Sequence, residues 1–160
     1  MTKNTISQLQ TNVDRLWARA NLGRSTEIIE TRPIGDGTPY VEMMDNLYVL
    51  VFEERGKEIE RQVGLTLFEA SRWYVFSMAT RYALNAELRD RQIPVGAPLT
   101  PHGLTDDGYS RWNWMALAIK IMDSISSDLG DWALAHYRSV LLNYPLEDYE
   151  KRNSRWPLLT

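Results

Sequence analysis

Hydrophobic and polar positions recur with two different periods along this chain, and the change of period separates helices from strands. Apolar residues follow a helical spacing from Ile6 to Ala20. At the start of this segment, Thr5 and Gln8 have the spacing of a capping box. The pattern predicts a helix over 6–22 that stops at Gly23. In the second half of the chain the same period predicts helices over 67–90, 108–126 and 130–143.

The start signals of the later helices are of two kinds. Thr66 and Glu69 repeat the capping-box spacing at the beginning of the long aromatic helix. Asp106 or Asp107 is the predicted N-cap of the next helix, because a short carboxylate side chain accepts hydrogen bonds from the free N–H groups there. The last helix should end before Pro145, since the residue ahead of a proline disfavours helical geometry.

Between the first two helices the period changes to two, which predicts strands over 39–44, 47–54 and 58–65. Asp45-Asn46 and Arg55-Gly56-Lys57 supply the residues that tight turns need. The middle strand is apolar on both faces, as in a strand covered on both sides. In the third strand one face carries Ile59, Val63 and Leu65 and the other face carries Glu58, Glu60 and Gln62, which indicates a half-exposed edge strand.

The order of these elements predicts an α+β fold: an N-terminal helix, a short antiparallel three-stranded meander, then three helices packed on it. With 160 residues and no linker-like tract, we expect a single domain over 1–160. The segment 92–105 contains three prolines and joins two predicted helices. A connection of this length is more often functional or mobile than a short one.

Composition narrows the functional classes. The net charge of −3 and the pI of about 5.4 give no basic surface for non-specific nucleic-acid binding. The chain contains no cysteine, so it has no thiolate nucleophile and no thiolate metal ligand. No apolar run approaches membrane-spanning length, and the N-terminus lacks a signal-peptide core. We therefore expect a soluble cytoplasmic protein without a membrane or nucleic-acid partner.

Candidate chemistry is sparse. His102 lies in the proline-rich loop near Asp106 and Asp107, but no metal-binding histidine motif accompanies it. His136 lies within a predicted helix, where a structural role is the expectation. We predict no metal, no cofactor and no catalytic residue. An enzyme built on the His102, Asp106 and Asp107 loop remains an alternative.

Several short motifs follow one another in an order that resembles a known family. They are Glu54-Arg55-Gly56, Ala79 with Tyr82, Asp107 with Arg111, Trp132, and the turn Tyr144-Pro145-Leu146-Glu147-Asp148. The series is similar to a bacterial polymorphic-toxin immunity family, immunity protein 63, over about 37–148. The 92–105 loop is longer than the family pattern, and the tail after Asp148 has no counterpart in it.

The resemblance implies a protein that binds a cognate toxin C-terminal domain in the cytoplasm and neutralises it without catalysis, by covering the active site or a neighbouring surface. Six carboxylates are the predicted toxin-binding groups: Glu53, Glu54, Glu58, Glu60, Asp106 and Asp107. Arg55 and Arg111 are the predicted members of a structural network, with direct contact to the toxin as the alternative. The rival hypothesis is a non-enzymatic adaptor module with a different protein partner.

Overall fold

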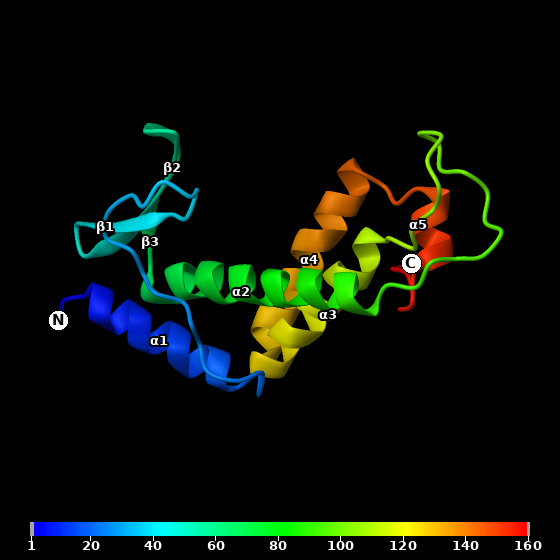
Figure 1. Cartoon of the computed structure of the whole chain (residues 1–160). Helices are drawn as coiled ribbons and strands as arrows, with labels where there is room; N and C mark the ends of the chain where they lie inside the picture. Colours follow the sequence, from blue (N-terminus) through cyan, green and yellow to red (C-terminus); the bar gives the residue numbers. More distant parts are fainter. Residues whose placement is uncertain (1, 160) are drawn as a thin grey trace. The chain divides into compact units, whose positions relative to one another are not determined.

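A computed structural model of the protein describes residues 2–159 (Figure 1). The elements along the chain are α1 (Ile6–Ala18), β1 (Tyr40–Met44), β2 (Leu47–Glu54), β3 (Lys57–Leu65), α2 (Leu67–Asp90), α3 (Arg111–Ile125), α4 (Ser127–Asn143) and α5 (Asp148–Asn153). This order confirms the α+β class. The chain divides into two compact units, the first ending at Val75 and the second beginning at Phe76, and each is described by itself. A single domain over 1–160 stays a prediction.

In the first unit, α1 begins at the predicted capping box. The Thr5 hydroxyl accepts from the Gln8 N–H at 3.1 Å, and the Gln8 side chain accepts from the Thr5 N–H at 3.0 Å. The helix ends at Ala18, four residues before the predicted end at 22. After Ala18 the backbone N–H groups of Arg19 and Ala20 donate to carbonyls three residues back, so the last turn tightens and the α-helix stops.

The three strands form an antiparallel sheet in the order β1-β2-β3, as predicted. Asp45 and Asn46 have φ values of 52° and 64°, and Arg55 and Gly56 have 50° and 78°, so both hairpins use two-residue turns with positive φ. The middle of β2, from Tyr48 to Val51, is buried on both faces, which confirms its prediction as a covered central strand.

The pairing of β2 with β3 contains two register shifts, and they correct the predicted faces of β3. Leu50 pairs with Gln62, but Tyr48 pairs with Leu65, so Leu65 lies on the same face as Gln62 and not with Val63. A second shift places Glu58 opposite Glu53, whereas Glu60 lies opposite Phe52. Glu58 and Glu60 therefore lie on opposite faces, because an inserted residue reverses the alternation.

β3 is also more exposed than its apolar alternation predicts. Ile59 is 63% exposed and Val63 is 55% exposed, although a half-buried strand would cover both. Within the described part of the chain, β3 has a paired strand on one side only, as an edge strand does. The surface of the first unit consequently includes two aliphatic side chains among charged residues of the same strand.

In the second unit, α3 and α4 pack against each other, and a single residue, Ser126, connects the end of α3 to the start of α4. The Ser126 hydroxyl accepts from the Leu129 N–H at 3.3 Å, so α4 starts at Ser127 and not at 130 as predicted. A Cβ at Gly130 would lie 2.5 Å from Asp123 Oδ1, so only glycine allows the two helices to approach so closely. A core cluster forms around Ala83, Trp112, Met115, Ala118 and Tyr137.

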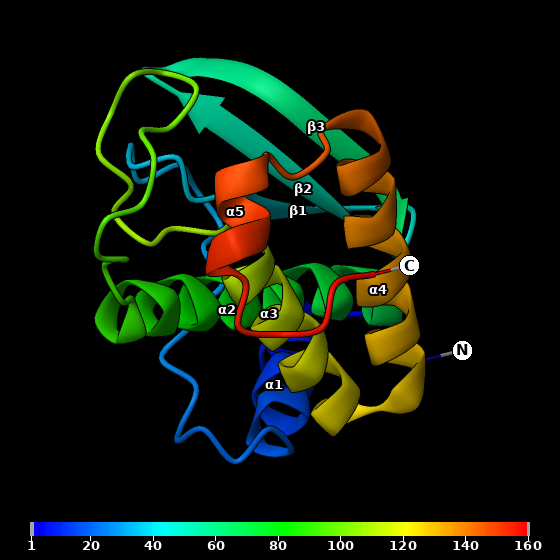
Figure 2. The same cartoon turned by 90° about the vertical axis from the view of Figure 1, so that its right-hand side faces the viewer.

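The prediction that Asp106 or Asp107 caps α3 is wrong. The N-cap is Ser110, and α3 begins at Arg111 and not at 108. Both aspartates are instead used in local turns, because Asp106 accepts from the Gly108 N–H at 2.9 Å and Asp107 accepts from the Tyr109 N–H at 3.0 Å. Sequence reasoning also missed α5, which contacts α3 and appears beside it in Figure 2.

Candidate functional site

One face of the sheet carries a surplus of carboxylates around one guanidinium. Glu53 and Glu58 lie directly opposite each other on β2 and β3. Arg61 donates to Glu58 Oε1 and to Glu42 Oε2, each at 2.8 Å. The hydrogen bond from Arg61 lowers the pKa of Glu58, whereas desolvation and the charges of Glu53 and Glu42 raise the pKa of Tyr40 beside them. Two carboxylates share the Arg61 guanidinium and Glu53 lies opposite one of them, so these three carboxylates outnumber the guanidinium beside them and give this face a local negative charge.

The opposite face of the same hairpin is closer to charge balance. Glu54 lies opposite Lys57, and Glu60 accepts from the Gln62 amide at 2.8 Å. The predicted toxin-binding carboxylates of the hairpin are thus divided between two faces, with Glu53 and Glu58 on one and Glu54 and Glu60 on the other. Arg55 is exposed in the turn, and its side chain makes no hydrogen bond or ion pair with any residue between 2 and 159.

In the second unit, Asp107 takes part in a cluster at the base of the long loop. Arg91 donates from Nη1 to Asp107 Oδ2 at 2.7 Å, and its Nε and Nη2 atoms donate to Glu87 at 3.0 and 2.7 Å. Its guanidinium also lies 5.0 Å from the centre of the Tyr109 ring. Two carboxylates share this one guanidinium. Two further guanidinium groups lie close by at Asp90, where Arg89 pairs with the carboxylate and Arg155 donates to the backbone carbonyl. Asp107 is exposed, whereas Glu87 is buried.

Asp106 is buried, unlike its neighbour, and does not reach the surface of the unit. Its Oδ1 atom accepts from the Asn153 amide at 2.7 Å and from the Gly108 N–H. Burial by itself raises the pKa of this carboxyl, but these hydrogen bonds and Arg152 outweigh it and hold the pKa below its usual range. Asp106 therefore connects the loop to α5. Of the two neighbouring aspartates, only Asp107 has its carboxylate exposed at the surface.

Arg111 joins three segments of the second unit. It donates from Nε to Glu150 Oε1 at 2.8 Å and from Nη2 to Glu150 Oε2 at 2.9 Å. It also donates to the backbone carbonyls of Tyr144 and Pro145 at 3.1 and 2.8 Å. Arg111 thereby fixes the start of α3 to α5 and to the turn before α5. The resemblance drew attention to Arg111, but its partner Glu150 is 39 residues away and no motif pointed to it.

The two histidines have separate surroundings. His102 is exposed in the turn over 100–104, within the long loop that joins α2 to α3, and its Nε2 atom lies 3.6 Å from Glu147 Oε1. His136 stacks on Trp132 with ring centres 5.4 Å apart, and desolvation lowers its pKa. Within residues 2–159 no three His, Asp or Glu side chains converge closely enough to hold a metal ion.

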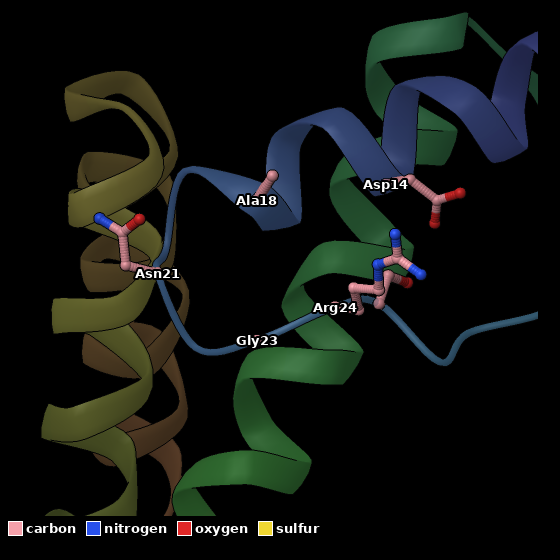
Figure 3. Close-up of a pocket in the computed structure, with 6 residues that line it drawn as sticks. Asp14, Ala18, Asn21, Gly23 and Arg24 are labelled. Atoms are coloured by element: carbon pink, nitrogen blue, oxygen red, sulfur yellow. The ribbon is translucent and has the colours of Figure 1, made fainter.

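The first unit contains a surface hollow of about 660 Å³ beyond the end of α1 (Figure 3). Its lining comes from Asp14 and Ala18 on the helix and from Asn21, Gly23 and Arg24 after it. One carboxylate and one guanidinium border the hollow, and all five of these residues are exposed. Such a lining offers no desolvated acid, base or nucleophile, so the hollow is a weak candidate for chemistry.

No protein-family model matches this chain, and no curated protein and no solved structure shows significant similarity to it. None of the helices in the described part of the chain is both long enough and apolar enough to cross a membrane. Functional inference therefore rests on the side chains themselves.

Proposed function

We propose that this chain is an immunity protein that binds a cognate toxin domain and neutralises it by covering its active surface. The observation that carries the proposal is the carboxylate surplus on the Arg61 face of the sheet, next to the exposed side chain of Val63. A small apolar contact within a charged surface of one sign is the arrangement that selects a protein partner of opposite charge. The ordered motifs between 37 and 148 favour a toxin as that partner.

Binding at this face requires no chemistry from the chain. The side chains of Arg61, Glu42 and Glu58 are 38%, 45% and 43% exposed to water. Water screens such groups, so they suit recognition better than proton transfer. Basic groups of the toxin would replace water around Glu53 and Glu58, and the exposed side chain of Val63 would be covered at the same time.

Co-expression tests the proposal directly. The C-terminal domain of a toxin encoded beside this chain is induced in bacteria with and without the chain, and growth and co-purification are measured. We expect growth to be restored and the two proteins to purify together. If cells die while the chain is present in at least equal amount, and nothing co-purifies, the proposal is wrong. Co-purification with an unrelated protein alone would favour the adaptor hypothesis.

The two faces of the hairpin provide a matched comparison. Glu53→Gln with Glu58→Gln removes two charges from one face, and Glu54→Gln with Glu60→Gln removes two from the other. Both double variants have the same net charge, so a difference between them reports the position of the charges. We expect the first to weaken toxin binding by about 10-fold at low salt, and less at high salt. Equal effects of the two variants would exclude this face as the contact.

A further inference from the structure

A pocket of about 320 Å³ opens on the second unit between the end of α4, α5 and the segment after α5. Its lining combines an apolar majority with two cations, and none of the described residues that line it has a carboxylate. The apolar residues are Trp112, Leu141, Leu142, Pro145, Leu146, Leu158 and Leu159, and the cations are Arg138 and Lys151. Small-molecule sites have volumes of about 300–1,000 Å³ and a mostly apolar lining with a few polar groups, so this pocket has the size and composition of a site for a small ligand.

The apolar lining extends from the core to the surface. Leu141, Leu146 and Leu159 are partly buried and pack against the core cluster of the second unit. Leu142 is 78% exposed and Leu158 is 41% exposed, so these two leucines border the mouth of the pocket. A hydrocarbon that enters would therefore cover leucine side chains that now contact water, which is favourable in proportion to the apolar area removed from water.

Two hydrogen bonds hold the walls of the pocket in place. Trp112 donates from Nε1 to the carbonyl of Pro157 at 2.9 Å, which fixes the segment after α5 to α3. Arg111 donates from Nη2 to the carbonyl of Pro145 at 2.8 Å, which fixes the turn between α4 and α5. Figure 2 shows the segment after α5, in red, running from that helix past α3 to the side of α4. A pocket that is formed before its ligand arrives loses little conformational entropy on binding.

The charge at the pocket is positive. Arg138 precedes Leu141 and Leu142 by three and four residues, so it shares their face of α4. Its side chain is exposed and makes no hydrogen bond or ion pair with any residue that the structure describes. Lys151 Nζ lies 3.8 Å from Asp148 Oδ1, but these side chains are 52% and 92% exposed, and water weakens so exposed a pair. The pocket therefore has one guanidinium without a counter-charge and one loosely paired ammonium group.

This combination selects one chemical class of ligand. The planar fork of a guanidinium matches a carboxylate, and the leucines favour a hydrocarbon. Inorganic phosphate would leave the apolar lining uncovered. A neutral hydrocarbon would remove water from Arg138 without supplying a negative group, and an alkylammonium ion would be repelled.

We propose that this pocket binds a small amphipathic carboxylate, with its carboxylate on Arg138 and its hydrocarbon against Leu141 and Leu146. Lys151 adds a second positive charge at the same end of the ligand. The inference goes beyond the proposed function, because the pocket belongs to the second unit and neither a toxin nor the sheet contributes to it. A ligand here would also link α4, α5 and the segment after α5, since it contacts all three.

The test is a titration of the full-length, ¹⁵N-labelled chain at neutral pH, followed by NMR of the backbone amides. The probes are octanoate, 1-octanol and octylammonium, which share one hydrocarbon and differ in charge. We expect octanoate to shift the amide signals of Leu142, Leu146 and Leu158, and to bind at least about 10-fold more tightly than 1-octanol. Octylammonium should cause no shift at these residues.

Three variants separate the charge from the apolar lining. Arg138→Gln should weaken octanoate binding by about 10-fold and leave the affinity for 1-octanol unchanged. Leu142→Asp places a carboxylate at the mouth and should abolish octanoate binding. Leu88→Asp is its control, because Leu88 is 65% exposed, lies outside the pocket and gives the same net charge. Circular dichroism melting curves should match the unmodified chain for all three, since each position is exposed.

Several outcomes would overturn the inference. Octylammonium binding as tightly as octanoate would do so, and so would octanoate affinity that is unchanged in Arg138→Gln or Leu142→Asp. Two results would assign the pocket to another occupant: self-association in analytical ultracentrifugation that Leu142→Asp abolishes, or toxin binding lost in Leu142→Asp while octanoate does not bind the unmodified chain. Failure of the chain to neutralise the toxin would overturn the proposed function alone.

Discussion

Replacing Glu150 with glutamine should destabilise the second unit strongly, although the side chain keeps its size. The carboxylate is 2% exposed and accepts four hydrogen bonds: from Arg111 N, Nε and Nη2, and from the backbone N–H of Glu147, at distances between 2.8 and 3.1 Å. An amide NH₂ in place of one oxygen faces two donors and can accept from neither. The variant also leaves the Arg111 guanidinium without its counter-charge.

The magnitude follows from the bonds that are lost. Two hydrogen bonds to a charged acceptor contribute on the order of 1.5–3 kcal/mol each. The loss is reduced because the Arg111 side chain is 25% exposed and keeps its bonds to the carbonyls of Tyr144 and Pro145. We therefore expect Glu150→Gln to lower the free energy of unfolding by about 3 kcal/mol. For cooperative unfolding of a chain of this size, that corresponds to a decrease in Tm of about 6–12 °C.

Urea denaturation gives the free energy, and hydrogen exchange read by mass spectrometry gives the location. Peptides from α3 and α5 should exchange faster in Glu150→Gln, whereas peptides from β1, β2 and β3 should not change. Glu60→Gln is the matched control, because Glu60 is exposed and accepts one hydrogen bond, from Gln62, so its free energy of unfolding should change by less than about 0.5 kcal/mol. A loss below 0.5 kcal/mol for Glu150→Gln would refute the reasoning.

The same pair predicts a pH dependence. Burial raises the pKa of Glu150, but the donors of Arg111 and Glu147 outweigh it and hold the pKa below its ordinary value. A carboxyl with a lowered folded pKa stabilises the protein above its unfolded pKa of about 4.3, and this contribution is lost as the pH falls further. The difference in urea midpoint between the unmodified chain and Glu150→Gln should therefore be constant from pH 7 to about 5 and shrink below about 4.3. A constant difference down to pH 3.5 would contradict this.

Four further substitutions test three local features. In urea denaturation, Gly108→Ala should lower the free energy of unfolding by at least about 3 kcal/mol, because φ is 87° and the new Cβ would overlap the Gln92 carbonyl. Gly96→Ala is its control: φ is also positive, but the space around Gly96 is open, so the free energy of unfolding should fall by about 1 kcal/mol. Thr5→Ala should lose about 1 kcal/mol and increase amide exchange in the first turn of α1. Tyr74→Phe should leave urea stability unchanged or increase it, because the buried hydroxyl makes no hydrogen bond to any residue from 2 to 159. A loss above about 1 kcal/mol would disprove that.

Candidate functional residues were predictable only where their partners are close in sequence. Glu53 and Glu54 are neighbours on β2, so the alternation of a strand puts them on opposite faces, and the register agrees. Glu58 and Glu60 were assigned to one face by the same rule, and an inserted residue between them separates the two. The pattern of apolar residues does not reveal such an insertion, because β3 is exposed and few apolar contacts specify its register.

The long loop shows a similar division. Its prolines and its length indicated a functional or mobile segment, and its lack of charge is visible in the sequence. Its ends meet because Arg91 pairs with Asp107 and Gly108 contacts Gln92, at sequence separations of 16 residues. No local propensity encodes these contacts, so only the folded chain distinguishes a held loop from a mobile one.

The sequence by itself determined most of the elements of this protein, with the short helix α5 as the exception, and the tertiary structure decided the environments of its polar groups. The capping boxes at Thr5 and Thr66 and the turn at Arg55-Gly56 depend on hydrogen bonds and torsions within four residues, so short patterns predict them. The burial of Asp106 and Glu150 depends on donors that come from distant segments. A charged side chain enters a core only where such donors replace water, and which donors arrive is a property of the complete fold.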